Sequence, residues 1–176
     1  MIIGLGTDIL NTLRLQAFSL NRLSRLSKRI LTAKEFALMQ DTTGFPTSSP
    51  LHAPFAHHSD EGFRVEAVSR FLGVRWAAKE AIYKALYPHY VLTWKDVEAL
   101  PISMSKHRTG KLDSAEAGER RSSLWDPNPS SGKLQLRFTK SLCINVNEIA
   151  LSKLNVHMSI SHDNDMVVAT VLVEGE

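Results

Sequence analysis

The segment of the chain that most constrains the fold is a long helix, predicted over residues 64–87 and ended by Pro88. Its apolar residues recur three and four positions apart, which is the pattern of a helix with one face against the core. These residues are Val68, Phe71, Leu72, Ala78, Ile82 and Leu86. Glu80 and Lys84 lie four residues apart, so a carboxylate and an ammonium project from one helix face. Such a pair is most often an ion pair at the surface that contributes only a few tenths of a kcal/mol.

A second carboxylate stands near the start of the chain. Residues 1–10 are apolar and rich in β-branched side chains, which predicts a buried strand, and Asp8 lies near its end. An acidic residue in this place is often only a turn residue. Mg²⁺, however, takes oxygen ligands and commonly uses only one or two protein carboxylates, with water and phosphate oxygens as the remainder. If the fold brings Asp8 and Glu80 together, they form a magnesium site with Lys84 beside it for a phosphate group.

The length of 176 residues suits one domain with a substantial core. Two polar stretches, at about 41–62 and 106–131, are interpreted as loops inserted into that domain. No apolar run approaches the roughly 20 residues of a membrane span, and Cys143 is the single cysteine, which excludes a disulfide within the chain. No targeting presequence is visible. These features predict an intracellular protein, mitochondrial if the source is eukaryotic and cytoplasmic otherwise.

Residues 12–31 are predicted to form one helix with a single buried apolar stripe. At about 100° per residue, its five cationic side chains fall within roughly a third of the helix circumference, with no acidic residue between them. They are Arg14, Arg22, Arg25, Lys28 and Arg29. A cationic face of this kind is usually only solvated, but it also suits docking to an acidic protein surface. The net charge of +3 is too small to indicate a nucleic acid as partner.

The rest of the chain contains shorter helix and strand patterns. Thr32 and Glu35 match a capping box, which predicts a short helix from residue 33 to about residue 39. Further elements are expected as a strand within 93–103, a strand over 134–138, a helix over 141–154, and a hairpin of 156–161 with 166–173. The hairpin turn then comprises residues 162–165. His162, which follows alternating serines, is either a turn residue or a donor to a phosphate group.

Three ordered motifs give this chain a resemblance to a known family. They are Gly4-Leu5-Gly6-Thr7-Asp8-Ile9 with Arg14 downstream, then Arg70-Phe71-Leu72 with Arg75-Trp76-Ala77-Ala78-Lys79-Glu80-Ala81 and Lys84-Ala85, and finally Ser159-Ile160-Ser161-His162 before an apolar strand. Together they resemble the holo-acyl-carrier-protein synthase type of 4′-phosphopantetheinyl transferase, over most of the chain outside the two inserts. Two departures are Asn11, where an acidic residue is common, and residues 86–90, which lack a Gly/Thr-rich turn. The inserts point to a eukaryotic, fungal member.

The resemblance implies a fold and an activity. The expected fold is α+β, with a small antiparallel sheet packed against the long central helix, in a homotrimer whose sites are shared between subunits. The expected activity is the Mg²⁺-dependent transfer of 4′-phosphopantetheine from coenzyme A to a serine of apo acyl carrier protein. This reaction yields holo acyl carrier protein and 3′,5′-ADP, and it serves fatty acid biosynthesis.

The resemblance also assigns roles to single residues. Asp8 and Glu80 would hold Mg²⁺, and Glu80 would act as base for the serine proton. Lys84 would contact the leaving phosphate and donate a proton to it. Arg75, Lys84 and His162 would contact the phosphates of coenzyme A. The residues expected to dock the acidic carrier protein are Arg14, Arg22 and Arg25.

Two other classes of function are weighed against this transferase. A non-catalytic module that binds the carrier protein or coenzyme A would keep the basic helix without a complete set of Asp8, Glu80 and Lys84. A nucleic-acid-binding domain would fit the sequence pI of about 9.1, but the basic helix lacks interleaved aromatic side chains and a recognised binding motif. Neither a nucleic acid nor a membrane is therefore an expected partner.

Overall fold

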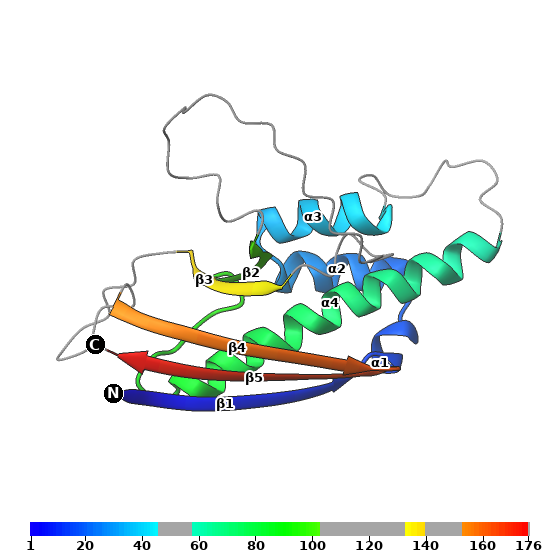
Figure 1. Ribbon diagram of the computed structural model, residues 1–176. Coiled ribbons are helices and arrows are strands. Elements are labelled where there is room, and N and C mark those ends of the chain that lie inside the picture. The colour runs from blue at the N-terminus through cyan, green and yellow to red at the C-terminus, as the bar shows by residue number, and fades with distance from the viewer. Residues whose placement is uncertain (46–57, 103–132, 140–152, 176) are drawn as a thin grey trace, which may run out of the picture.

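The computed structural model describes residues 1–45, 58–102, 133–139 and 153–175, and in it one long helix lies across a three-stranded sheet (Figure 1). In chain order the elements are β1 (Ile2–Asn11), α1 (Leu13–Gln16), α2 (Leu20–Ile30), α3 (Ala33–Thr43), α4 (His58–Leu86), β2 (Val97–Pro101), β3 (Leu134–Phe138), β4 (Leu154–Asp163) and β5 (Met166–Gly175). Helix α4 lies between the sheet and the helices α2 and α3 (Figure 1). This arrangement confirms the predicted α+β fold. No helix of the described residues is long and apolar enough to cross a membrane.

The three-stranded sheet is antiparallel, in the order β1-β5-β4, whereas β2 and β3 form a separate antiparallel pair. Alternate residues of β5 are buried on the side of the sheet that α4 covers; they are Val167, Ala169, Val171 and Val173. The outer face is open: Leu5 and Ile9 of β1 are 64% and 62% exposed. The prediction that β1 is a buried strand was therefore wrong for this face, because only every second residue of a strand points to the core.

Two glycines of β1 allow the strand and α4 to approach very closely. A Cβ atom added to Gly4 would lie 1.8 Å from the carbonyl oxygen of Ala85, and one added to Gly6 would lie 2.0 Å from that of Ala81. Residues that alternate along a strand point to the same face, so Asp8 follows Gly4 and Gly6 on the side that faces α4. The glycines thus bring the Asp8 side chain next to the helix that carries Glu80.

The single helix predicted over residues 12–31 is two helices, α1 and α2, separated at residues 17–19. Ser19 has extended backbone angles (φ −63°, ψ 155°) and serves as the N-cap residue of α2, a position that serine favours over a helix interior. As a result Leu13, which the predicted apolar stripe included, is 50% exposed. Arg14 lies on α1 rather than on the helix that carries Arg22 and Arg25, so the five cations do not share one helix face.

Other boundaries also differ from the sequence-based predictions. The capping box of Thr32 and Glu35 is confirmed, but α3 continues to Thr43 rather than ending near residue 39. Helix α4 begins at His58, six residues before the predicted start. The hairpin is confirmed with longer strands, so His162 belongs to β4 instead of the turn. Most of both predicted inserts and nearly all of the predicted helix over 141–154 lie outside the described residues.

Candidate active site

Asp8 and Lys84 join β1 to α4 at the candidate site. The Lys84 Nζ donates to Asp8 Oδ1 at 2.7 Å and to the backbone oxygen of Thr7 at 3.0 Å. The Lys84 side chain is 48% exposed and that of Asp8 is 15% exposed, so the ion pair opens to solvent on the lysine side. Lys84 is therefore held at the site and is accessible to a bound anion.

Glu80 is the second carboxylate of the site and lies one helical turn before Lys84. Burial is the largest cause that raises the pKa of the half-buried Glu80 carboxyl, and the negative charge of Asp8 raises it further, while Lys84 acts in the opposite direction. Asp8 accepts a hydrogen bond from Lys84, and Glu80 lies on the same face of α4 one turn before Lys84, so the fold brings the two carboxylates into one neighbourhood. A cation placed between them would relieve their repulsion.

The two carboxylates fit the requirements of Mg²⁺. This ion uses one or two protein carboxylates and keeps water or phosphate oxygens in its other positions. Among the described residues no group of three or more His, Cys, Asp or Glu side chains could hold a metal ion, so a site made from protein ligands alone is absent from that part of the chain. Asp8 and Glu80 therefore suit a metal that shares its coordination sphere with a phosphate group.

A pocket of about 230 Å³ opens beside Glu80. Its walls include the side chains of Tyr83, Leu92, Trp94 and Val97. This volume lies below the roughly 300 Å³ at the lower end of sites that enclose a whole ligand, so the pocket suits part of a larger molecule. The sequence did not predict it, because residues 92–97 reach α4 only through the tertiary fold.

Comparison with known proteins identifies the family. The chain matches the model of the 4'-phosphopantetheinyl transferase superfamily over residues 4–139. This chain belongs to that superfamily. The matched region contains Asp8, Glu80 and Lys84, and the resemblance stated from the motifs is confirmed.

Two similar proteins are both named holo-[acyl-carrier-protein] synthase. A holo-[acyl-carrier-protein] synthase of Polynucleobacter asymbioticus is 27% identical over 175 residues, which are 98% of this chain and 98% of that protein. One from Shewanella baltica is 36% identical over 85 residues, 48% of this chain and 49% of that protein.

Two solved structures of holo-acyl-carrier-protein synthases share the fold. The holo-(acyl-carrier-protein) synthase of Bacillus anthracis, in complex with CoA (3',5'-ADP), gives a TM-score of 0.54 at 22% identity, over 100% of this chain and 99% of that one. The holo-ACP synthase of Plasmodium yoelii gives a TM-score of 0.57 at 18% identity, over 100% and 97% of the two chains. At these identities the similarity establishes the fold.

Arg75, which the resemblance to the superfamily assigned to coenzyme phosphates, lies inside the protein. It is 5% exposed, its guanidinium carbon lies 3.3 Å from the centroid of the Phe71 ring, and it donates to the Phe71 carbonyl oxygen at 3.2 Å. Burial lowers its pKa to about 10, and the charge of Glu35 partly offsets this effect. Five residues separate Arg75 from Glu80, which places them roughly 140° apart around the helix. The structure thus does not bring Arg75 to the carboxylate pair.

His162 also lies away from Asp8 within one chain. It lies in β4 and pairs with Val167 of β5, and β5 separates β4 from β1, the strand that carries Asp8. Two strand spacings amount to about 10 Å, so the two residues are not neighbours in the sheet. The structure thus does not place His162 directly beside Asp8 in one chain.

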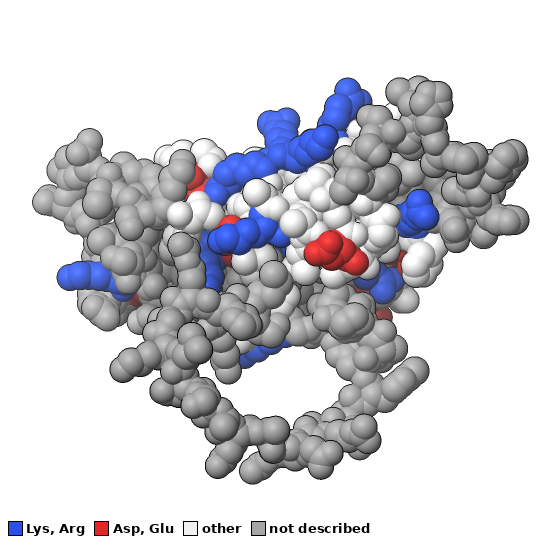
Figure 2. Space-filling model, turned by 90° about the horizontal axis from the view of Figure 1, so that it is seen from above, with Lys and Arg blue, Asp and Glu red and all other residues white. Residues whose placement is uncertain are grey.

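The predicted docking residues lie on α1 and α2 and are exposed. Figure 2, seen from the side on which α2 and α3 lie, shows a row of Lys and Arg side chains along this face. The exposed cations of α1 and α2 are Arg14, Arg22, Arg25, Lys28 and Arg29. The guanidinium of Arg22 lies 3.6 Å from the centroid of the Phe18 ring, which holds it in place. Lys95 donates to the backbone oxygens of Lys28 and Leu31 and so adds a cation at the end of α2.

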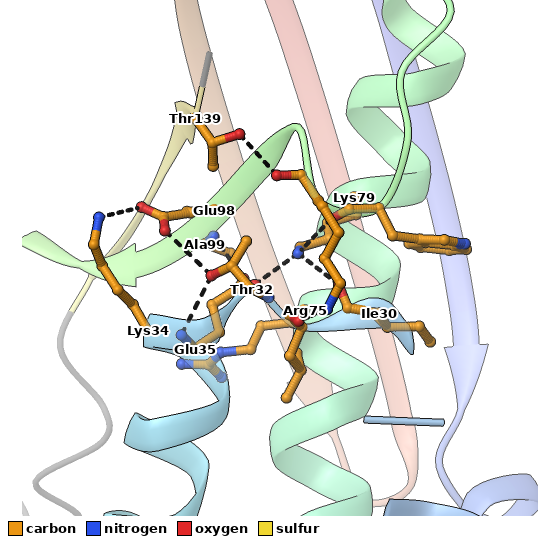
Figure 3. Close-up of polar contacts among 12 residues, drawn as sticks. Ile30, Thr32, Lys34, Glu35, Arg75, Lys79, Glu98, Ala99 and Thr139 are labelled. Atoms are coloured by element: carbon orange, nitrogen blue, oxygen red, sulfur yellow. Dashed lines mark hydrogen bonds and ion pairs between the residues drawn. The ribbon is translucent and has the colours of Figure 1, made fainter. Parts of the chain in front are cut away.

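The sequence-based predictions did not include the buried ion pair of Lys79 and Glu35, which lies directly beside the site. Lys79 and Glu35 form a 2.7 Å salt bridge with side chains 2% and 0% exposed (Figure 3). Burial lowers the pKa of Lys79, and Glu35 opposes that shift. The partners are 44 residues apart, so no local pattern could reveal the pair.

Proposed function

We propose that this protein is a holo-acyl-carrier-protein synthase. It transfers the 4′-phosphopantetheine group of coenzyme A to a serine of apo acyl carrier protein, with holo acyl carrier protein and 3′,5′-ADP as products. The observation that supports this best is the meeting of Asp8, Glu80 and Lys84 across β1 and α4 in a member of the 4'-phosphopantetheinyl transferase superfamily.

Asp8 and Glu80 would hold Mg²⁺, which when bound neutralises negative charge on the diphosphate oxygens. The raised pKa of Glu80 suits it to accept the serine proton. The serine oxygen forms a bond to the phosphorus that carries the pantetheine arm, and the bond from that phosphorus to the bridging oxygen breaks. Lys84 stabilises the charge on the departing 3′,5′-ADP and can donate a proton to it. The pocket beside Glu80 accommodates part of coenzyme A.

The basic surface of α1 and α2 would dock the carrier protein. Arg14, Arg22 and Arg25 are exposed, and exposed cations attract an acidic partner and orient it during encounter. Because α1 and α2 are separate helices, Arg14 and Arg25 would contact different parts of the carrier protein.

A homotrimer with shared sites is part of the proposal. The outer face of the sheet exposes Leu5 and Ile9, and apolar side chains in such a position suit burial against another copy of the chain. In that assembly His162 of one subunit would reach the phosphates bound by Asp8 and Glu80 of its neighbour. The buried Arg75 instead packs on the Phe71 ring, and its charge interacts favourably with that of Glu35. The chain would form one domain with two inserted loops. It would act in mitochondria if the source is a eukaryote and in the cytoplasm otherwise.

Intact-mass spectrometry of apo acyl carrier protein incubated with coenzyme A and Mg²⁺ tests this function. The expected result is a mass increase of one 4′-phosphopantetheine group together with release of 3′,5′-ADP. A protein that binds coenzyme A and the carrier protein without producing either product would instead be the non-catalytic module.

A further inference from the structure

The Lys79 ammonium lies where four segments of the chain meet (Figure 3). Its Nζ donates to Glu35 Oε2 at 2.7 Å, to the backbone oxygen of Ile30 at 2.9 Å and to that of Trp94 at 2.9 Å. An ammonium group has three N–H donors, so these bonds use all of them. Lys79 therefore has no donor left for a substrate, although its side chain lines the pocket beside Glu80.

The Glu35 carboxylate extends these connections. Its Oε1 accepts from the backbone N–H of Ala99 in β2 at 2.8 Å, and its Oε2 accepts from that of Thr32 at 2.8 Å. Together with Lys79, it joins the end of α2, the start of α3, β2 and the segment around Trp94 to one point on α4. Each bond is directional, so the pair fixes orientations as well as distances.

We propose that Lys79 and Glu35 are positioning residues for the transfer reaction. They set the Trp94 wall of the pocket and the end of the basic helix α2 in fixed places relative to Glu80, the next residue after Lys79. This inference rests on the proposed function, because coenzyme A would bind at the first of these places and the carrier protein at the second. Neither residue touches the reacting atoms.

Stability alone does not account for the pair, because well-packed apolar residues of similar volume often replace a buried ion pair without loss of stability. Apolar residues would not, however, replace the hydrogen bonds that Lys79 donates to the backbone oxygens of Ile30 and Trp94. A role confined to stability would change the melting temperature and leave kcat of the folded enzyme unaltered. A positioning role lowers kcat in enzyme that is fully folded.

The test compares a neutral double variant, Lys79→Met/Glu35→Gln, with a matched control, Arg70→Met/Glu66→Gln. The control removes an exposed ion pair of the same helix, whose atoms lie 3.2 Å apart. Activity is measured at a temperature at which both variants are folded. Steady-state kinetics with varied coenzyme A and varied carrier protein should show kcat reduced at least about tenfold in the first variant and unchanged in the control.

Hydrogen exchange of the same proteins gives a readout that does not depend on activity. Amides of residues 93–99 should exchange faster in the Lys79→Met/Glu35→Gln protein, whereas those of β1 and β5 should not change. Unchanged kcat in the folded double variant, or unchanged exchange over 93–99, would overturn the inference. If the wild-type protein shows no turnover but the double variant still loosens residues 93–99, the proposed function fails while positioning of this segment by the pair stands.

Discussion

Lys84 on α4 donates a hydrogen bond of 2.7 Å to Asp8 on β1, a residue 76 positions earlier in the chain. The bond exists because Gly4 and Gly6 let the strand lie directly on the helix. It places a cation beside the two carboxylates before any substrate is bound. In the proposed reaction Asp8 uses its oxygens for the metal, and Lys84 is the accessible residue that can turn to the phosphate.

Replacing Lys84 with Met should lower kcat by about a hundredfold, because the departing phosphate loses its cation and proton donor. Stability should change little, since an ion pair this exposed contributes about 1 kcal/mol or less. Steady-state assays combined with thermal unfolding measure both effects. Near-normal kcat in the Met variant would contradict the role of Lys84.

Replacing Glu80 with Gln should stabilise the metal-free protein near neutral pH. A carboxyl whose pKa is raised by folding stabilises the fold below its unfolded pKa, and this contribution is lost as the pH rises through the folded pKa. The ionised Glu80 is therefore slightly unfavourable near neutral pH. The expected gain in free energy of unfolding is about 0.5 kcal/mol, kept small by solvent screening.

Urea denaturation of metal-free wild type and Glu80→Gln at several pH values checks this prediction. The difference in stability should disappear in acid, where the wild-type carboxyl is protonated. Added Mg²⁺ should stabilise the wild type more than the variant, because a bound ion favours the ionised carboxylates. A Gln variant that is less stable than the metal-free wild type near neutral pH would disprove the account of Glu80.

Replacing Gly6 with Ala should destabilise the protein by about 1–3 kcal/mol, because the new methyl group meets the helix backbone. The Cβ would lie 2.0 Å from the carbonyl oxygen of Ala81, so β1 and α4 must separate. Activity should fall as well, since Asp8 moves with the strand. Gly62→Ala is the matched control: apart from its own helix backbone and chain neighbours, nothing lies within 4 Å of the added Cβ, and alanine favours a helix. Equal melting temperatures of the two variants would contradict the close approach.

Replacing Arg14 with Glu should raise the KM for the carrier protein and leave the affinity for coenzyme A unchanged. Reversal of one exposed charge in a docking surface mainly slows association, and the effect should shrink as salt is added. Lys153→Glu, an exposed lysine next to β4, serves as the control for net charge. Weaker binding of coenzyme A by the Arg14 variant would place that residue in the coenzyme site instead.

The motifs are short and local, so the sequence alone shows the resemblance from which the fold class and the roles of Asp8, Glu80 and Lys84 were predicted. The sequence-based predictions were wrong where contacts between distant segments determine the position of a residue or the end of a helix. The stripe over residues 12–31 gave no sign of the break at Ser19. The resemblance assigned Arg75 to the coenzyme phosphates, whereas the structure buries it against Phe71. The pairing of Lys79 with Glu35 and the approach of Trp94 to Glu80 depend on packing between distant segments.

The most direct test of the account is a titration of Mn²⁺, as a spectroscopic substitute for Mg²⁺, in the presence of coenzyme A. It should be followed by electron paramagnetic resonance in the wild type, Asp8→Asn and Glu80→Gln, with conversion of apo carrier protein measured on the same samples. Each substitution should weaken metal binding and abolish most conversion while the protein stays folded. Metal binding and conversion at wild-type levels in either variant would contradict a metal site shared by Asp8 and Glu80.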